Sequence, residues 1–315
     1  INGTIGSISK YNNEKVMLGK SIGYFNFKKS RDFYYHILQS NKIQDYFISE
    51  LTGSTIKNLS LKTLRETNIY QPSLAEQTRI ADFLSSIDEK LNLLKEKKSL
   101  LEDYKKGIMQ KIFNQEIRFK DDNGEDFEEW EEKTFGEMST IRRGASPRPI
   151  TDAKWFDENS KIGWVRISDV TKSNKYLFKT EQYLSVLGVN KSRLVTKGNL
   201  IMSICATIGK PIYTNFDVCI HDGFVVFENL KGYREYFYYY LQYIQKNWYN
   251  YGQPGTQVNL NSDIVSNELL LFPSIDEQTK IANFLSAIDE KIELVSNQIL
   301  DTQEYKKGLL QQMFV

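Results

Sequence analysis

The stretch that decides the fold occurs twice in this chain. Residues 73–113 read SLAEQTRIADFLSSIDEKLNLLKEKKSLLEDYKKGIMQKIF, and residues 274–314 read SIDEQTKIANFLSAIDEKIELVSNQILDTQEYKKGLLQQMF. The two stretches align without a gap at an offset of 201 residues, and the segments EQT, IDEK and YKKG recur in register. Agreement of this length indicates an internal duplication.

Both copies carry the same helix start signals. A proline, a serine and, three residues after the serine, a glutamate occur in each copy: Pro72, Ser73 and Glu76, then Pro273, Ser274 and Glu277. A proline stops the preceding element, and serine followed by glutamate at this spacing predicts a capping box. Each stretch is therefore predicted to be a helix that begins at its serine.

Apolar residues follow the starts at alternating spacings of four and three. In the first copy they are Ile80, Leu84, Ile87, Leu91, Leu94, Leu101, Ile108 and Ile112; in the second they are Ile281, Leu285, Ile288, Ile292, Val295, Ile299, Leu309 and Met313. A heptad-like stripe calls for a long helical partner, and the nearest is the other copy. A helix of about 40 residues is roughly 60 Å long, which suits a spacer better than a core helix.

Composition places the chain among ordinary soluble proteins. Its 315 residues, 40% hydrophobic and 26% charged, allow two globular domains besides the helices. Without a long apolar run or a secretory signal, we expect a cytoplasmic protein. Cys205 and Cys219 fit reduced thiols, with a mutual disulfide as the alternative, and the histidines His36 and His221 complete no metal-ligand cluster.

Residues 1–72 resemble the second half of the segment 130–273. Asn2–Gly6 matches Cys205–Gly209, and Ser30–Tyr35 matches Tyr233–Tyr238. Counterparts of about 130–202 do not precede residue 1. We therefore expect a fragment, or a truncated gene product, of a protein built as domain, helix, domain, helix.

Residues 130–273 are predicted to form a small α+β domain. Short β-rich runs occur at 163–168, 200–204, 210–214, 223–227 and 268–272, and a tyrosine-rich helix is expected at about 233–250. Its aromatic stripe favours core packing, while a stacking platform for bases is the alternative. The acidic linker 114–129 favours solvated surface over mimicry of a phosphate backbone.

No catalytic motif emerges from the sequence. Dinucleotide-binding, Walker and nucleophile-elbow patterns are missing, as is the N/D-P-P-aromatic tetrapeptide of adenine methyltransferases. Asp88-Glu89-Lys90 and its repeat at 289–291 look like a nuclease cluster, but beside a heptad seam such residues usually make solvated ion pairs. The chain is predicted to bind rather than to catalyse.

Three loops are candidates for DNA contact, and Arg166, Ser168 and Asp169, which close the segment WVRISD at 164–169, could face the same surface. The loop from Arg142 to Pro149 carries three guanidiniums, which suit phosphate contact or readout of guanine, and a solvated loop is the alternative. A glycine loop at 252–259 carries amides, which pair with adenine, and its twin lies at 52–58. The candidate DNA-binding residues are Arg142, Arg143, Ser146, Arg148, Arg166, Ser168, Gln253, Thr256, Gln257, Asn259, Thr55 and Lys57.

The doubled helix motif E-Q-x-x-I-A-x-F-L-x-x-I-D-E-K and the segment W-V-R-I-S-D at 164–169 resemble the specificity subunit of type I restriction-modification systems. The resemblance covers essentially the whole chain. It implies an α+β fold in which small β-rich target recognition domains are joined by two long helices forming an antiparallel coiled coil. The implied segments are a partial first recognition domain (1–72), a helix (73–113), a linker (114–129), a second recognition domain (130–273) and a helix (274–315).

The resemblance also implies a division of labour. Each domain would read half of a bipartite DNA site, two modification subunits would methylate adenine with S-adenosylmethionine, and restriction subunits would then join for cleavage. The chain itself would hold no cofactor or metal. Its first domain lacks counterparts of the arginine loop and of 164–169.

The helix ends are nearly identical whereas their middles differ, as two docking sites for one partner would require. Recent duplication is the alternative explanation. The candidate docking residues are Phe83, Asp88, Lys90, Tyr104, Phe284, Asp289, Lys291 and Tyr305. A structural coiled-coil adaptor whose domains bind protein remains the alternative function, followed by an enzyme in its own right.

Overall fold

The fold is described from a computed structural model that covers residues 5–53, 57–251 and 260–314. The chain divides into two compact units. Unit 1 comprises residues 1–102 and 290–315, and unit 2 comprises residues 103–289. Each unit therefore combines a globular part with pieces of both long helices, whereas the predicted boundaries followed whole helices.

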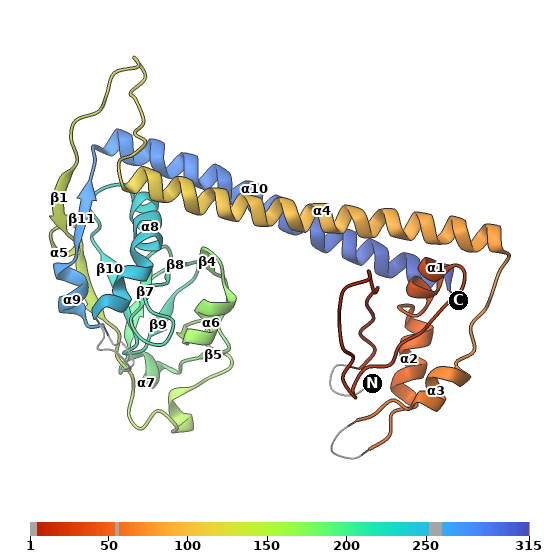
Figure 1. Ribbon diagram of the computed structural model, residues 1–315. Helices are drawn as coiled ribbons and strands as arrows, with labels where there is room; N and C mark the ends of the chain where they lie inside the picture. The colour runs from red at the N-terminus through yellow and green to blue at the C-terminus, as the bar shows by residue number, and fades with distance from the viewer. Residues whose placement is uncertain (1–4, 54–56, 252–259, 315) are drawn as a thin grey trace. The chain divides into compact units, whose positions relative to one another are not determined.

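The duplicated stretches form the two longest helices, α4 (Leu74–Phe113) and α10 (Ile275–Met313) (Figure 1). All sixteen residues of the predicted apolar stripes are buried or partly buried. In unit 1 the first turns of α4 pack against the last turns of α10, through Leu84 and Leu310 among others. In unit 2 the last turns of α4 meet the first turns of α10, so the helices are antiparallel, as expected.

The predicted capping boxes form only in part. The Ser73 and Ser274 hydroxyls accept hydrogen bonds from the amides of Glu76 and Glu277, at 3.3 and 3.4 Å. The Glu277 carboxylate does not return the bond. It accepts hydrogen bonds from Arg118 and Trp130 instead, because residues 118–130 cross the start of α10.

The described residues of unit 2 form three antiparallel or mixed sheets. A two-stranded sheet pairs β1 with β11, a five-stranded sheet has the order β2-β10-β7-β8-β4, and a four-stranded sheet has the order β5-β3-β9-β6. The strands are β1 (Glu131–Thr134), β2 (Thr140–Arg143), β3 (Gly163–Val165), β4 (Tyr176–Leu177), β5 (Gln182–Tyr183), β6 (Arg193–Val195), β7 (Leu200–Ser203), β8 (Pro211–Thr214), β9 (Val218–Ile220), β10 (Phe224–Glu228) and β11 (Leu269–Phe272). The five predicted β-rich runs correspond to β3, β7, β8, β10 and β11.

The main core of unit 2 lies between the two larger sheets. Val165, Val218 and Ile220 from the four-stranded sheet pack with Ile201 and Val226 from the five-stranded sheet. All five side chains are buried, so these two sheets form one domain.

The helices of unit 2 are short except for α8 (Arg234–Tyr243), which continues as the 3₁₀ helix η2 (Ile244–Tyr251). The others are α5 (Phe135–Met138), η1 (Ala153–Trp155), α6 (Ile167–Lys172), α7 (Val186–Val189) and α9 (Ser262–Asn267). Residues Tyr236–Leu241 are buried, and Tyr238 stacks on Tyr213 of β8 at 5.4 Å between ring centroids. The tyrosines of α8 are core, as the sequence favoured, whereas Tyr249 and Tyr251 at the end of η2 are exposed.

The globular part of unit 1 is helical in its described residues. It contains α1 (Arg31–Ile37), α2 (Asn41–Ser49) and α3 (Leu61–Glu66), with an isolated bridge between Thr52 and Asn58. The helix α1 corresponds to α8, since Phe33 meets Phe314 of unit 1 much as Tyr236 meets Phe113 of unit 2, at 5.8 and 5.7 Å between ring centroids. This agrees with the predicted repeat of the second half of 130–273.

Among the described residues, none of the helices combines the length and apolar character needed to cross a bilayer. The same residues offer no group of three potential metal ligands. Both cysteines are free thiols, as expected, and Cys219 is buried.

Candidate nucleic-acid interface

Two residues of the predicted arginine loop, Arg142 and Arg143, belong to β2 and pair with β10, so only the part from Gly144 onward is a loop. This part is held against the end of β9 and the start of β10. The amide of Gly144 donates to the Phe224 carbonyl at 2.9 Å, and that of Ala145 donates to the Ile220 carbonyl at 3.0 Å. A Cβ at position 144 would lie 2.0 Å from the His221 carbonyl oxygen. Only glycine fits this approach, so the loop is an ordered part of the domain and not the free turn that its glycine and prolines suggested.

Asp222 holds the arginine segment through hydrogen bonds from three of its residues. Its carboxylate accepts hydrogen bonds from the Ser146 hydroxyl at 2.8 Å and from Arg148 at 3.0 Å. Its backbone carbonyl accepts from Arg143 Nε at 2.7 Å. Burial opposes ionisation of Asp222, but the Ser146 hydrogen bond and the Arg148 charge outweigh it and lower the pKa of the carboxyl. The side chain is thus a stable anion that fixes three candidate residues.

A pocket of about 180 Å³ opens beside this anchor. It is lined by Arg143, Ile204, Cys205, His221, Asp222, Gly223 and Leu260. Burial lowers the pKa of His221, the charge of nearby Arg166 lowers it further, and Asp222 partly opposes both. His221 Nδ1 accepts a hydrogen bond from the Gly223 amide at 2.8 Å, so the ring is neutral with its proton on Nε2. Burial also raises the pKa of the Cys205 thiol, which argues against a nucleophile.

Some predicted DNA-binding residues meet at the pocket, because Arg143 lines it and Ser146 and Arg148 bind Asp222 of its lining. Arg142 and Ser168 are not among the residues that line it. The side chains of Arg142 and Arg148 remain 53% and 73% exposed although each pairs with a carboxylate, Glu228 and Asp222 respectively, at 3.0 Å. Arg166 is exposed, and its charge acts on His221, so it faces the same region as the loop. Ser168 is exposed on α6, whereas its neighbour Asp169 is buried and caps that helix.

Five further predicted contacts are not covered by the structure. Gln253, Thr256, Gln257, Asn259 and Thr55 lie outside the described residues, although Leu260, which follows the amide loop, lines the pocket. Lys57 is an exposed residue of unit 1.

Sequence reasoning missed Asp222 and Arg193. Arg193 Nε donates to the Arg143 carbonyl at 3.1 Å and adds a cation to the cluster. The Asp222-Gly223 pair between two apolar runs marks a turn, which was the available signal. Nothing in the sequence indicates that this turn lies beneath a loop about 76 residues earlier.

The family model "Type I restriction modification DNA specificity domain" matches residues 1–103 and 127–303. These ranges make up most of the chain. The chain belongs to this specificity family.

Curated members of the specificity family include two relatives from Methanocaldococcus jannaschii. The putative type I restriction enzyme MjaX specificity subunit is 27% identical over 291 residues, covering 87% of this chain and 64% of the relative. The type I restriction enzyme MjaVIII specificity subunit is 25% identical over 300 residues, covering 87% of this chain and 68% of the relative. The chain thus spans about two thirds of the length of these family members.

A solved structure of the specificity family has the same fold. The type I restriction-modification S subunit from M. genitalium matches with a TM-score of 0.57 at 18% identity, covering 90% of this chain and 72% of that chain. Its agreement confirms the predicted α+β architecture with long paired helices.

The eight candidate docking residues of this specificity-family chain fall into three groups. Asp88 and Asp289 are used internally, because Lys306 pairs with Asp88 at 2.5 Å in unit 1 and Lys105 pairs with Asp289 at 2.7 Å in unit 2. Lys90, Lys291, Tyr104 and Tyr305 are exposed. The two phenylalanines differ: Phe83 is 43% exposed, whereas Phe284 packs edge-on against Phe119 at 5.5 Å between ring centroids.

Ion pairs are present at Asp88 and its repeat, as predicted, but they join opposite helices and are largely buried, whereas solvated pairs were expected. The surroundings of these two ion pairs differ at one position, which is His36 in unit 1 and Tyr239 in unit 2. In unit 2 the Tyr239 hydroxyl donates to Asp289 at 2.7 Å and lies 3.1 Å from the Ser286 hydroxyl. In unit 1 that place is taken by His36, whose Nε2 lies 3.1 Å from the Ser85 hydroxyl.

Proposed function

We propose that this chain is a non-catalytic DNA-specificity subunit of a type I restriction-modification complex. It would read a bipartite DNA site with two recognition domains and leave methyl transfer and cleavage to other polypeptides. The observation that carries the proposal is the Asp222-anchored arginine loop beside a pocket, in a chain of the specificity family.

The loop chemistry suits double-stranded DNA. Exposed guanidiniums supply phosphate contacts and, when bidentate, readout of guanine O6 and N7. A loop that is already ordered by Asp222 loses little conformational entropy on binding. Arg148, whose side chain is 73% exposed, is assigned to phosphate contact, and Arg143, which lines the pocket, is assigned to base readout.

Replacing Arg148 with alanine is expected to weaken DNA binding about three- to tenfold for all sequences and to flatten its salt dependence by about one charge. Replacing Arg143 with alanine is expected to cost about 1–3 kcal/mol on the preferred sequence and less on others. Fluorescence anisotropy with duplexes that contain the methylated sites of the host genome, titrated at several salt concentrations, measures both effects.

The matched control for these two variants is Lys133→Ala, in the separate two-stranded sheet of unit 2. Its DNA affinity is expected to stay unchanged. DNA binding without salt dependence, or equal losses for Lys133→Ala and Arg148→Ala, would contradict the proposal and favour the protein-binding adaptor.

We also propose that the helices capture two modification subunits, which carry S-adenosylmethionine, and that restriction subunits join them. The exposed residues Tyr104 and Tyr305, with Lys90 and Lys291, are the assigned contacts, since each pair repeats at the same offset. The aspartates are excluded because their carboxylates hold the helices together.

Tyr104→Asp and Tyr305→Asp are each expected to remove one modification subunit from the co-purified complex, and the double variant is expected to remove both. Burying a new carboxylate at an aromatic contact costs several kcal/mol. Native mass spectrometry of co-expressed complexes measures the stoichiometry. Lys95→Asp, another exposed position on α4, is the control, and full occupancy in the double variant would refute this docking surface.

A further inference from the structure

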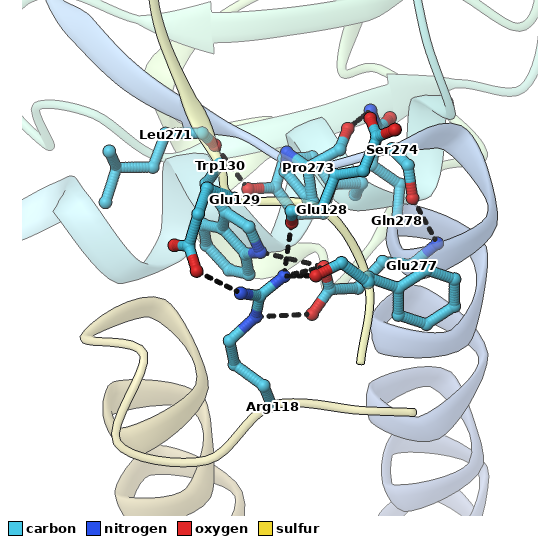
Figure 2. A network of polar contacts seen from close by, with 11 residues as sticks. Arg118, Glu128, Glu129, Trp130, Leu271, Pro273, Ser274, Glu277 and Gln278 are labelled. Carbon is cyan, nitrogen blue, oxygen red and sulfur yellow. Dashed lines mark hydrogen bonds and ion pairs between the residues drawn. The ribbon is translucent and has the colours of Figure 1, made fainter. Parts of the chain in front are cut away.

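The start of α10 is covered by residues 118–130, here called the covering segment (Figure 2). Glu277, which is 0% exposed, accepts hydrogen bonds from Arg118 Nε at 3.3 Å, Arg118 Nη2 at 2.9 Å and Trp130 Nε1 at 2.8 Å. One helical turn further on, Lys280 Nζ donates to the Lys120 carbonyl at 2.8 Å and to Asp122 at 2.6 Å. The ring contact between Phe119 and Phe284 completes the interface.

The start of α4 has the same local structure. Gln77 donates to the Pro72 carbonyl at 2.8 Å, and Gln278 donates to the Pro273 carbonyl at 2.7 Å. The Thr78 hydroxyl donates to the Leu74 carbonyl at 3.0 Å, and the Thr279 hydroxyl of α10 donates to the Ile275 carbonyl at 2.7 Å. The first turns of α4 and α10 therefore share both their sequence pattern and their local hydrogen bonds.

The two faces differ in what covers them. Glu76 repeats Glu277 but is exposed, and among the described residues no ion pair to its carboxylate is present. Arg79 repeats Lys280 and is exposed, and Phe83 repeats Phe284 and is 43% exposed. The carboxylate, the cation and the aromatic ring that bind the covering segment on α10 are thus all repeated on α4, where no described residue takes the place of that segment.

We propose that the face of α4 formed by Glu76, Arg79 and Phe83 binds an extended polypeptide segment of the same chemistry as the covering segment. Its arginine would pair with Glu76, the next residue's aromatic ring would pack on Phe83, and an acidic group would meet Arg79. The face is thus a polypeptide-binding surface for an Arg-Phe-Lys-type strand, distinct from the proposed DNA interface.

The occupant is polypeptide outside residues 1–315. The sequence contains one Arg-Phe-Lys, at 118–120, and its arginine is already bound to Glu277. A second copy would have to give up this buried pair to cover α4 of the first. Relatives are longer than this chain, which spans 64% of the MjaX subunit, so family members have further chain that could supply the segment.

The test uses a fluorescently labelled synthetic peptide of residues 114–132, titrated into the full 315-residue chain. We expect saturable binding below 1 mM that weakens at least tenfold in Glu76→Gln and in Phe83→Ser. Both side chains are exposed, so neither change threatens folding. A photo-crosslinking residue at position 83 should capture the peptide.

Two controls accompany the titration. Glu89→Gln, exposed on the same helix, should bind the peptide normally, and a peptide with Arg118→Met should bind at least tenfold more weakly. If the peptide instead displaced the chain's own covering segment from α10, its affinity would not change in Glu76→Gln or Phe83→Ser, because both residues are on α4.

Three outcomes would overturn the proposal. The first is no binding at 1 mM, and the second is binding that neither Glu76→Gln nor Phe83→Ser weakens. The third is a dimer of the chain that Phe83→Ser dissociates while the peptide fails to bind, since this would assign the face to a second copy.

Discussion

Replacing Arg118 with methionine is expected to destabilise unit 2 by about 3 kcal/mol, since breaking a buried ion pair leaves an uncompensated charge. Glu277 is fully buried and would retain only the Trp130 donor. Arg118 also donates to the carbonyls of Phe127 at 3.2 Å and Glu128 at 2.5 Å, so the change loosens the covering segment as well. Arg118 thus neutralises the buried carboxylate at the start of α10 and also holds the backbone of the covering segment in place.

Urea denaturation followed by tryptophan fluorescence measures this loss. The four tryptophans, Trp130, Trp155, Trp164 and Trp248, all belong to unit 2, so the signal reports that unit. The double variant with Glu277→Gln removes the orphaned charge and should recover more than half of the lost free energy of unfolding.

The matched control is Lys120→Met, which removes an ion pair with Asp126 between side chains that are 60% and 79% exposed. Its expected cost is below about 0.5 kcal/mol. A cost below about 1 kcal/mol for Arg118→Met, or a double variant as unstable as the sum of both single variants, would refute this account.

Acidification is expected to destabilise unit 1 through His36. Burial lowers the pKa of this histidine to about 4, and the Lys306 charge adds to the effect while Asp88 partly opposes it. Its Nδ1 has no hydrogen-bond partner among the described residues. The fold therefore accommodates the neutral ring.

The direction of the pH dependence follows from this lowered pKa. Between about pH 6.5 and 4 the unfolded chain binds the proton more readily than the folded one, so stability falls as the pH falls through this window. Lowering the pKa from 6.5 in the unfolded chain to about 4 in the folded chain corresponds to roughly 3 kcal/mol of stability, which is fully available above pH 6.5.

His36→Tyr is the informative variant, because Tyr239 at the equivalent place in unit 2 bonds to Asp289 and Ser286. It should remove most of this pH dependence. Hydrogen exchange of peptides covering 31–37 and 81–91, compared between pH 7 and 5 after correction for intrinsic rates, measures it in unit 1. The reciprocal Tyr239→His should add the same dependence to unit 2, beyond that of His221. An unchanged pH response in His36→Tyr would assign the effect to other groups.

The candidate site shows where sequence reasoning stopped. The arginine loop was found because three arginines, a glycine and two prolines crowd eight positions. The residues that hold this loop, Asp222 and Arg193, were not predicted, because they contact it only through the pairing of β2 with β10 and the packing of the two sheets. Likewise, heptad spacing predicted which residues of α4 and α10 would be buried, but the partners of Asp88 and Asp289 depend on the antiparallel arrangement.

The sequence by itself determined the duplication, both long helices with their apolar seams, the five main β-rich runs and the family. These features are local or periodic, so the spacing of residues along the chain encodes them. Only the tertiary structure decided which copy of a repeated residue is buried. Glu76 and Glu277 stand in the same sequence and the same helical turn, yet one is exposed and the other paired with Arg118 and Trp130. The difference comes from a segment 147 to 159 residues away along the chain, whose position no local pattern specifies.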